Sequence, residues 1–147
     1  MPYLNFDRLS LFSGLHCASC FGIVEIVGDL LEVGGCDINQ TDSTGSTPLV
    51  WAALKGHEGV VSVLLAPGDI LPDKSGSSGR TPLWHAVHSG HEVVVKIILG
   101  RDEVNPDKPD IYGRPPSWGA ASGGHEGMLE ILLQRDDVDP DKPDIYG

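Results

Sequence analysis

The sequence predicts an all-α solenoid in which short helix–turn–helix units stack in a row and extended turns join them. Three observations support this fold class. Two separate motifs recur together every 34 residues, each copy carries a helical stripe of apolar side chains, and a stretch rich in Pro, Asp and Gly separates the copies. A unit of this length cannot bury its own stripe, so neighbouring units must stack to form a continuous core.

The repeated motifs divide the chain into four copies. Gly-x-Thr-Pro-Leu begins at Gly45 and Gly79 and returns as Gly-Arg-Pro-Pro-Ser at Gly113, and Gly-His-Glu keeps the same spacing. A shift of 34 residues from Gly56 toward the N-terminus lands on Gly22, which indicates a degenerate first copy. The predicted organisation is a lead-in (1–12), a degenerate copy (13–44), two complete copies (45–78 and 79–112) and a weakened copy (113–147).

Each copy is predicted to begin with a short helix. Thr47 and Thr81 stand where a helix N-cap hydroxyl is wanted, and a proline follows each at the first helical position. Small residues come next, which lets the two helices of a copy approach closely. The glycine of Gly-His-Glu then ends the helix, and the glutamate lies at the positive end of the next one.

The second helix of each copy carries the apolar stripe. Its four positions are spaced as on one face of a helix, and all sixteen residues are apolar, so we expect them to be buried. They are Ile26, Val27, Leu30, Leu31, Val60, Val61, Leu64, Leu65, Val94, Val95, Ile98, Leu99, Met128, Leu129, Leu132 and Leu133. Prolines, aspartates and glycines then predict turns over 36–46, 68–80 and 102–114.

Composition narrows the classes of partner and the compartment. The 147 residues include 10 Lys and Arg against 21 Asp and Glu, for a net charge of −11, which disfavours nucleic acid and anionic membranes and favours a basic protein partner. No apolar run reaches the length of a membrane span. Three cysteines do not close a disulfide framework, and the first twelve residues lack the apolar core of a signal peptide. We therefore expect a protein of the cytosol, or of the nucleus.

No motif in the sequence predicts catalysis, a cofactor or a resident metal. Each His-Glu pair lacks the second histidine of a zinc-protease helix, and no phosphate-binding loop or nucleophile elbow occurs. Cys17-Ala-Ser-Cys20 has only His16 and Cys36 as further ligand candidates, so small, partly buried cysteines are favoured over a metal or redox site. His85 and His88 are interpreted as a surface pair. The chain is predicted not to be an enzyme.

Helix–turn–helix units with Thr-Pro-Leu and Gly-His at fixed offsets resemble the ankyrin repeat, from about Ser13 to Gly147. The Val-Asn-Pro-Asp-Lys-Pro-Asp linker and the opening Gly-Leu-His-Cys-Ala-Ser-Cys segment also resemble the ankyrin arrays of fungal NACHT-type receptor proteins. The resemblance implies that the histidine of Gly-His is structural and bonds backbone in the helix–helix turn. It also implies a protein–protein interaction scaffold or, alternatively, the regulatory or recognition arm of a larger NTPase or receptor.

In ankyrin repeats, partners usually contact the finger tips and the exposed positions of the first helix, on the concave groove. Carried over to this chain, the resemblance implies protein-binding positions at Ser43, Thr44, Ser46, Leu54, Lys55, Ser77, Ser78, Arg80, His88, Ser89, Ile111, Tyr112, Arg114, Ser122 and Gly123. Because Tyr and Arg dominate interface energies, Tyr112 with Arg80 and Arg114 is the predicted anchor cluster. Trp51, Trp84 and Trp118 are interpreted as core between copies, or as anchors if they reach the groove.

The last copy is predicted to be the loosest of the complete copies. Pro115 replaces the capping threonine and Ser117 replaces a core leucine, while the apolar stripe continues without the polar outer face of a terminal cap. We therefore expect a longer array of which this chain is a part. Its C-terminal end should fray or pair with another chain through the uncovered face.

Hydrogen exchange measures this expected gradient. Amides in residues 118–134 should exchange faster than those in residues 50–65, because exchange reports local opening and the last helix pair has a neighbour on one side only. Equal protection of the two segments in a dilute monomeric sample would show that the last copy caps itself.

Overall fold

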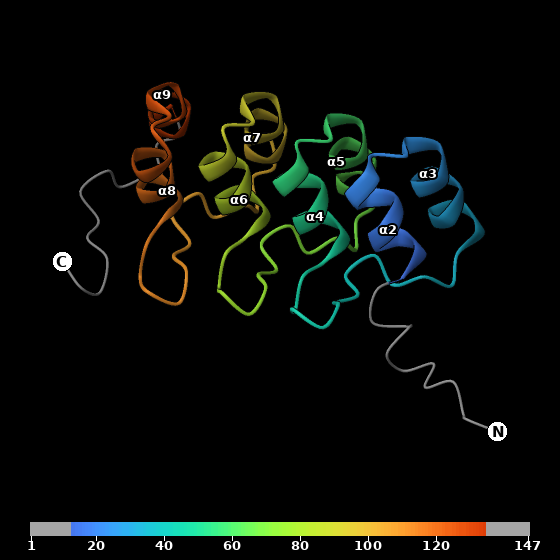
Figure 1. The fold of residues 1–147 in the computed structure, drawn as a ribbon. Coiled ribbons are helices and arrows are strands. Elements are labelled where there is room, and N and C mark those ends of the chain that lie inside the picture. Colours follow the sequence, from blue (N-terminus) through green and yellow to red (C-terminus); the bar gives the residue numbers. More distant parts are fainter. Residues whose placement is uncertain (1–12, 135–147) are drawn as a thin grey trace.

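Residues 13–134 are described in a computed structural model of the chain, and they form eight α-helices arranged in four pairs (Figure 1). The helices are α2 (Gly14–Phe21), α3 (Val24–Val33), α4 (Pro48–Lys55), α5 (Glu58–Leu65), α6 (Pro82–Ser89), α7 (Glu92–Leu99), α8 (Pro116–Gly123) and α9 (Glu126–Leu133). One pair lies within each of the four predicted copies.

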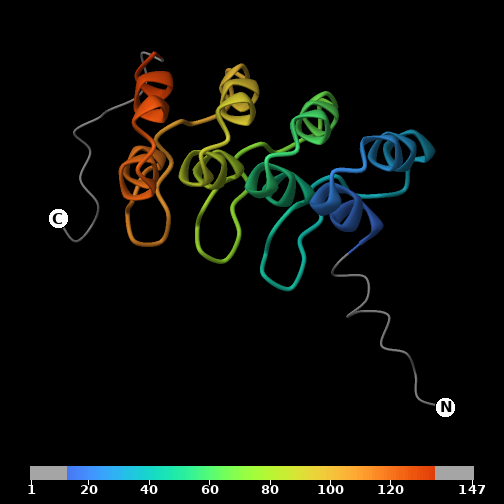
Figure 2. The ribbon, with the colours of Figure 1, turned by 45° about the horizontal axis from the view of Figure 1, so that its top comes forward.

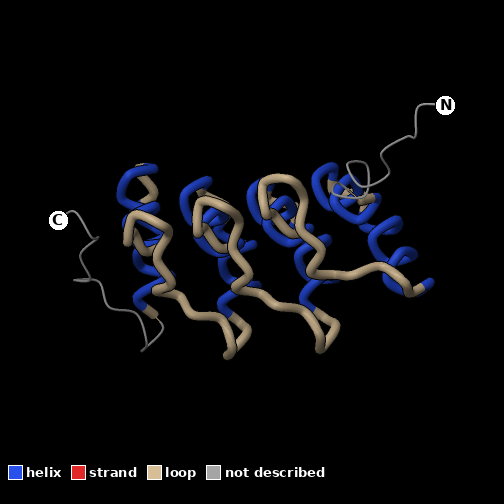
Figure 3. Tube along the Cα trace, turned by 90° about the horizontal axis from the view of Figure 1, so that it is seen from below, coloured by secondary structure: helices blue, strands red, loops and turns tan. Residues whose placement is uncertain are grey.

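The pairs stack into two layers. The first helices pack in the series α2, α4, α6 and α8, and the second helices pack in the series α3, α5, α7 and α9. Long turns project from the layer of first helices (Figures 1 and 2). Among the described residues, every segment between helices is loop or turn, including the three predicted turns (Figure 3). The prediction of an all-α solenoid with extended turns is confirmed.

The helix boundaries follow the local chemistry that the sequence predicts. Thr47 accepts a hydrogen bond from the Val50 amide at 3.2 Å, and Thr81 does the same for Trp84 at 3.1 Å. In the first copy Ser13 provides this cap for His16. Pro115 provides no side-chain cap for α8, as expected from its lack of a hydroxyl. The missing bond leaves α8 without a stabilising contribution of about 1 kcal/mol.

The apolar stripes form the core, but burial is uneven along the row. All four stripe residues of α5 are buried, as are three of the four in α7. In the outer copies Ile26 is 45% exposed and Leu133 is 49% exposed, so the expectation that all sixteen would be buried is wrong at these two positions. The reason is geometric, because each end copy has a described neighbour on one side only.

The histidines of the Gly-His motif join successive copies. Nε2 of His57 donates to the carbonyl of Cys20 at 2.8 Å, and Nε2 of His91 donates to the carbonyl of Leu54 at 3.0 Å. His125 donates in the same way to the carbonyl of His88 at 3.0 Å. The expected structural role holds, but each bond reaches the first helix of the preceding copy and not the backbone of its own turn.

The glycine that ends a first helix makes room for the histidine of the next copy. Gly56 is left-handed, with φ of 78°, and its amide closes the helix on the carbonyls of Ala52 and Ala53. A Cβ placed on Gly56 would lie 2.6 Å from Nδ1 of His91. Gly56 is therefore required both by the backbone conformation and by the close approach of the neighbouring copy.

We expect Gly56→Ala to lower the free energy of unfolding by about 2–3 kcal/mol. The left-handed backbone accounts for about 1–2 kcal/mol, and displacement of the His91 ring from its hydrogen bond accounts for about 1 kcal/mol more. Urea unfolding of Gly56→Ala, His91→Ala and the double variant gives a double-mutant cycle. A coupling of about 1 kcal/mol is expected, and strict additivity would show that the ring does not sense this position.

Candidate protein-binding surface

The turns that project from the first helices are short hairpins, here called the fingers (residues 42–46, 76–80 and 110–114). In the first finger the Asp42 amide donates to the Ser46 carbonyl at 2.9 Å, and a left-handed Gly45 closes the bend. Neighbouring fingers are joined, because the Ser77 amide donates to the Thr44 carbonyl at 2.9 Å. The Ile111 amide likewise donates to the Ser78 carbonyl at 3.0 Å, so the three fingers form one connected edge.

Buried aspartates hold the first and last fingers closed. Asp42 accepts hydrogen bonds from Thr44, from the Ser46 amide and from the indole of Trp51. Partial burial opposes ionisation of this carboxyl, but these hydrogen bonds outweigh it and lower the pKa of Asp42 below its ordinary value. Asp110 accepts amide bonds in the same way in the last finger, whereas Gly76 occupies this place in the middle finger.

The predicted contact residues lie at the finger tips and at the C-terminal ends of the first helices, and none of them is buried. Those exposed to solvent are Ser43, Thr44, Lys55, Ser77, His88, Ile111, Tyr112, Ser122 and Gly123. Those half-buried are Ser46, Leu54, Ser78, Arg80, Ser89 and Arg114. The structure therefore brings positions from three copies to one side of the molecule, here called the finger face and defined as the fingers and the first helices.

Five residues of the finger face form a continuous stack, here called the Arg–Trp cluster. The guanidinium of Arg80 lies 3.9 Å from the ring centroid of Trp84, and Trp84 stacks on Trp118 with 6.4 Å between centroids. Arg114 lies 4.3 Å from the Trp118 centroid and 4.9 Å from that of Tyr112. The predicted grouping of Tyr112 with Arg114 is present, and two tryptophans connect it to Arg80.

The tryptophans are mainly structural. Trp84 is fully buried and its indole donates to the Arg114 carbonyl at 3.0 Å, so the interpretation of Trp84 as core between copies is confirmed. His16 makes the equivalent bond to the Ser46 carbonyl in the first copy. Trp118 and Trp51 are half-buried.

Arg80 connects the fold and the surface. Its Nε lies 3.5 Å from Oδ2 of Asp110, a carboxylate that is itself buried. Removal of the guanidinium would deprive this buried carboxylate of a partner as well as removing a surface charge. A substitution of Arg80 therefore changes both stability and the finger face, whereas Tyr112 and Ile111 project from the finger tip.

The interpretation of His85 and His88 as a surface pair is wrong for His85. The His85 ring lies half-buried with its centroid 6.1 Å from that of Trp84, and the exposed His88 ring lies on the same indole at 5.1 Å. Burial lowers the pKa of His85 to about 4, and the charge of Arg80 and the proximity of His88 lower it further in the same direction. The His85 ring is therefore neutral near neutral pH.

The cysteines are all free thiols. Cys17 is exposed, which corrects the expectation that it would be partly buried, while Cys20 and Cys36 are half-buried. Within residues 13–134 no three His, Cys, Asp or Glu side chains gather into a group that could hold a metal ion. Across the same residues, no helix has the length and apolar character needed to cross a membrane.

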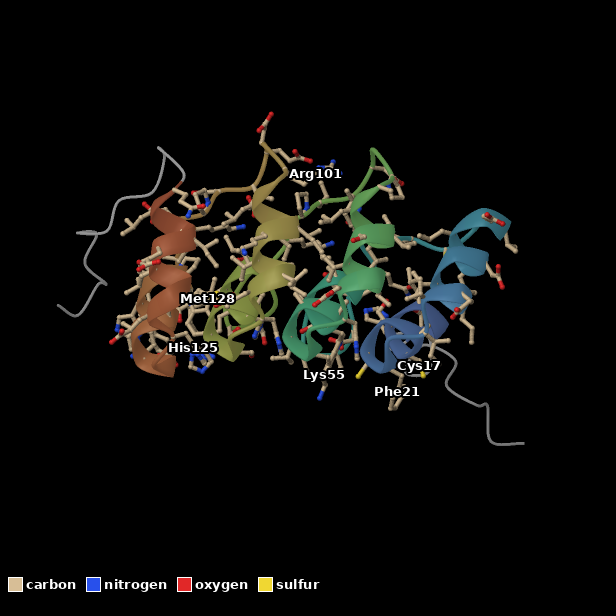
Figure 4. The ribbon with its side chains drawn as sticks, turned by 90° about the horizontal axis from the view of Figure 1, so that it is seen from above. Cys17, Phe21, Lys55, Arg101, His125 and Met128 are labelled. Atoms are coloured by element: carbon tan, nitrogen blue, oxygen red, sulfur yellow. The ribbon has the colours of Figure 1, made fainter. Side chains whose placement is uncertain are left out.

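Acidic and basic residues are segregated between the faces of the described chain. Apart from the buried Asp42 and Asp110, its acidic residues all lie on the second helices or on the back turns (residues 34–41, 66–75 and 100–109). These are Glu25, Asp29, Glu32, Asp37, Glu58, Asp69, Asp73, Glu92, Asp102, Glu103, Asp107, Glu126 and Glu130. Figure 4 shows the two edges, with Lys55 on the finger face and Arg101 on a back turn opposite. The expected basic partner rested on net charge alone, and it now applies to the acidic faces.

Sequence reasoning missed three residues of this surface. Asp42 and Asp110 each precede a conserved-register turn glycine by three residues, and that Asp-x-x-Gly spacing could have identified them. His85 follows Trp84 directly, but its burial depends on Arg80, which no local pattern reveals. The stacking of Trp84 on Trp118 was readable from their separation of 34 residues.

The fold and surface define a helical repeat protein whose copies each contact their neighbours. A family model described as ankyrin repeats in three copies matches residues 15–110 and again residues 67–144. The chain therefore belongs to the ankyrin repeat family. It is also 32% identical over 62 residues to the human ankyrin repeat and SAM domain-containing protein 3. That match covers 42% of this chain and 10% of the relative, so the chain spans about a tenth of that protein's length.

The lowered pKa of His85 predicts that the chain loses stability in mild acid. The ordinary histidine pKa is 6.5 and the folded value is about 4, so the unfolded chain binds more protons between these values. The contribution of His85 is fully present above pH 6.5 and decreases as the pH falls toward 4, by up to about 3 kcal/mol. Urea unfolding at several pH values should show this decrease.

The matched variant is His85→Gln, which cannot titrate and should lose less stability over the same interval. Asp42 does not confuse the comparison, because its lowered pKa places its own effect below its ordinary value of 3.8. Identical pH profiles for the two proteins would mean that His85 is not the group responsible.

Proposed function

We propose that this chain is a protein-binding scaffold whose partner occupies the finger face. Ankyrin repeats are generally protein–protein interaction modules. The observation that carries the proposal is that exposed positions from three copies share one side of a fold whose fingers are hydrogen-bonded to one another. Such an edge is preorganised, so little conformational entropy is lost when a partner binds.

The finger tip of the last hairpin provides the strongest candidate for an anchor. Ile111 is 57% exposed and Tyr112 is 42% exposed, although both are large and apolar, and Arg114 stacks on the tyrosine ring. Aromatic and arginine side chains contribute most to interface energies. Apolar residues of this size at a projecting tip fit a contact with another protein better than a purely solvated turn.

A second proposal is that the chain serves as the recognition or regulatory arm of a larger protein, such as an NTPase or receptor. The small share of the human relative that it covers supports this proposal, as does the resemblance of its linkers to arrays of NACHT-type receptors. A phosphate-binding Gly-x4-Gly-Lys motif in the same gene product would favour it. Ankyrin repeats are typically non-enzymatic, and we propose no reaction for this chain.

We also propose that the chain acts in the cytosol or nucleus and that its ends can self-associate. Three free thiols suit a reducing compartment. The half-exposed Leu133 and a cavity of about 290 Å³ beside Ala120, His125 and Leu129 lie at the last described copy, where a further copy would stack.

Substitution at the finger tip should weaken partner binding without unfolding the chain. After affinity capture of a partner by the full chain, Tyr112→Ala or Ile111→Ala should each raise Kd by about tenfold, because each removes an exposed apolar anchor. Calorimetric titration measures the affinity, and thermal unfolding checks the fold.

The matched control is Val93→Ala on α7, since Val93 is also apolar and 46% exposed but lies on a second helix. It should leave Kd unchanged. A loss of binding with Val93→Ala and none with Tyr112→Ala would place the partner on another face.

A further inference from the structure

The charge of the finger face is opposite in sign to that of the whole chain. Within residues 13–134 the exposed charged side chains on this face are Lys55, Arg80 and Arg114. Its acids, Asp42 and Asp110, are buried and are used to hold the fingers closed. A partner at this face therefore meets cations only, although the chain as a whole carries a net charge of −11.

The acidic faces do not cancel this local charge under physiological conditions. A helix is about 10 Å across, and the acids lie on the second helices and back turns beyond the first helices. The Debye length at physiological ionic strength is about 8 Å, so exposed charges a helix diameter apart are largely screened from one another. The nearest charges then decide what the finger face attracts.

Arg80 is held in place with hydrogen-bond donors to spare. Its plane lies on the Trp84 ring, and among the described residues its hydrogen bond to Asp110 uses Nε alone. Both Nη groups therefore remain available, and its side chain is 29% exposed. A guanidinium oriented by stacking is well suited to bind a carboxylate through two parallel hydrogen bonds.

We propose that the finger face binds an acidic segment of its protein partner, in which Asp or Glu side chains flank an aromatic or aliphatic residue. The carboxylates pair with Arg80 and Lys55, and the apolar residue packs against Ile111 and Tyr112 at the adjacent finger tip. The inference rests on the proposed function, because it names the chemistry of the partner at that same surface.

Two peptides that differ only in the sign of their charge test the inference, acetyl-Glu-Glu-Leu-Trp-Glu-Glu-amide and acetyl-Lys-Lys-Leu-Trp-Lys-Lys-amide. Each is titrated into the ¹⁵N-labelled full chain while amide and indole resonances are recorded. The acidic peptide should bind with a Kd on the order of 1 mM, shift the resonances of residues 76–88 and 110–118, and bind less tightly as salt rises.

Lys55→Gln should weaken the acidic peptide by about threefold and Arg80→Gln by about tenfold, as expected for an exposed and a stacked charge. The matched control is Lys96→Gln on α7, which removes a cation from a second helix and should have no effect. Lys55 is exposed and makes no contact on which the fold depends, so its variant remains informative even if Arg80→Gln lowers stability.

The inference is overturned if neither peptide binds, if the basic peptide binds the finger face as well as the acidic one, or if the acidic peptide binds the second helices. The natural partner separates the two proposals. If Tyr112→Ala weakens that partner while Lys55→Gln and Arg80→Gln do not, the finger face binds proteins but this account of its chemistry is wrong.

Discussion

The contact between one copy and the next is the constraint on which the structure depends. No copy is large enough to bury its own stripe, so burial comes from the neighbour. Val60 is fully buried between two copies, whereas Ile26, at the same register in the first copy, is half exposed. The histidine bonds follow the same logic, since Nε2 of His91 satisfies a carbonyl at the end of α4 in the preceding copy. Stability is therefore shared between neighbours along the row.

The local punctuation of the fold could be predicted from sequence, because it depends on chemistry within one turn of chain. A threonine cap, a proline after it and a glycine at the end act over a few residues, so Thr81 and Gly56 indicate where helices begin and end. The recipient of the His91 bond could not be predicted in this way. The register shows that the histidine recurs, but only the packing of two copies shows which carbonyl lies within reach.

The same distinction explains what was missed at the finger face. The finger-tip positions follow from register and lie where expected. The burial of His85 arises from Trp84 beside it and Arg80 above it, and it depends on how side chains from a finger and a helix come together. Composition likewise says nothing about placement. A net charge is a sum over the molecule, whereas a partner senses the charges within about a Debye length of its own.

The fold itself produces the unusual charge of the finger face. A finger closes when an aspartate accepts the amides of its own turn, and that use removes the carboxylate from the surface. The arginines of the same hairpins cannot be buried so cheaply and lie flat on tryptophans at its edge. Arg80 is therefore constrained by both stability and recognition, whereas Lys55, Ser77 and Ile111 at the exposed positions are free to change without loosening a finger. Differences in partner choice between arrays of this design should accumulate at such positions, because they are the part of the surface that the fold does not use.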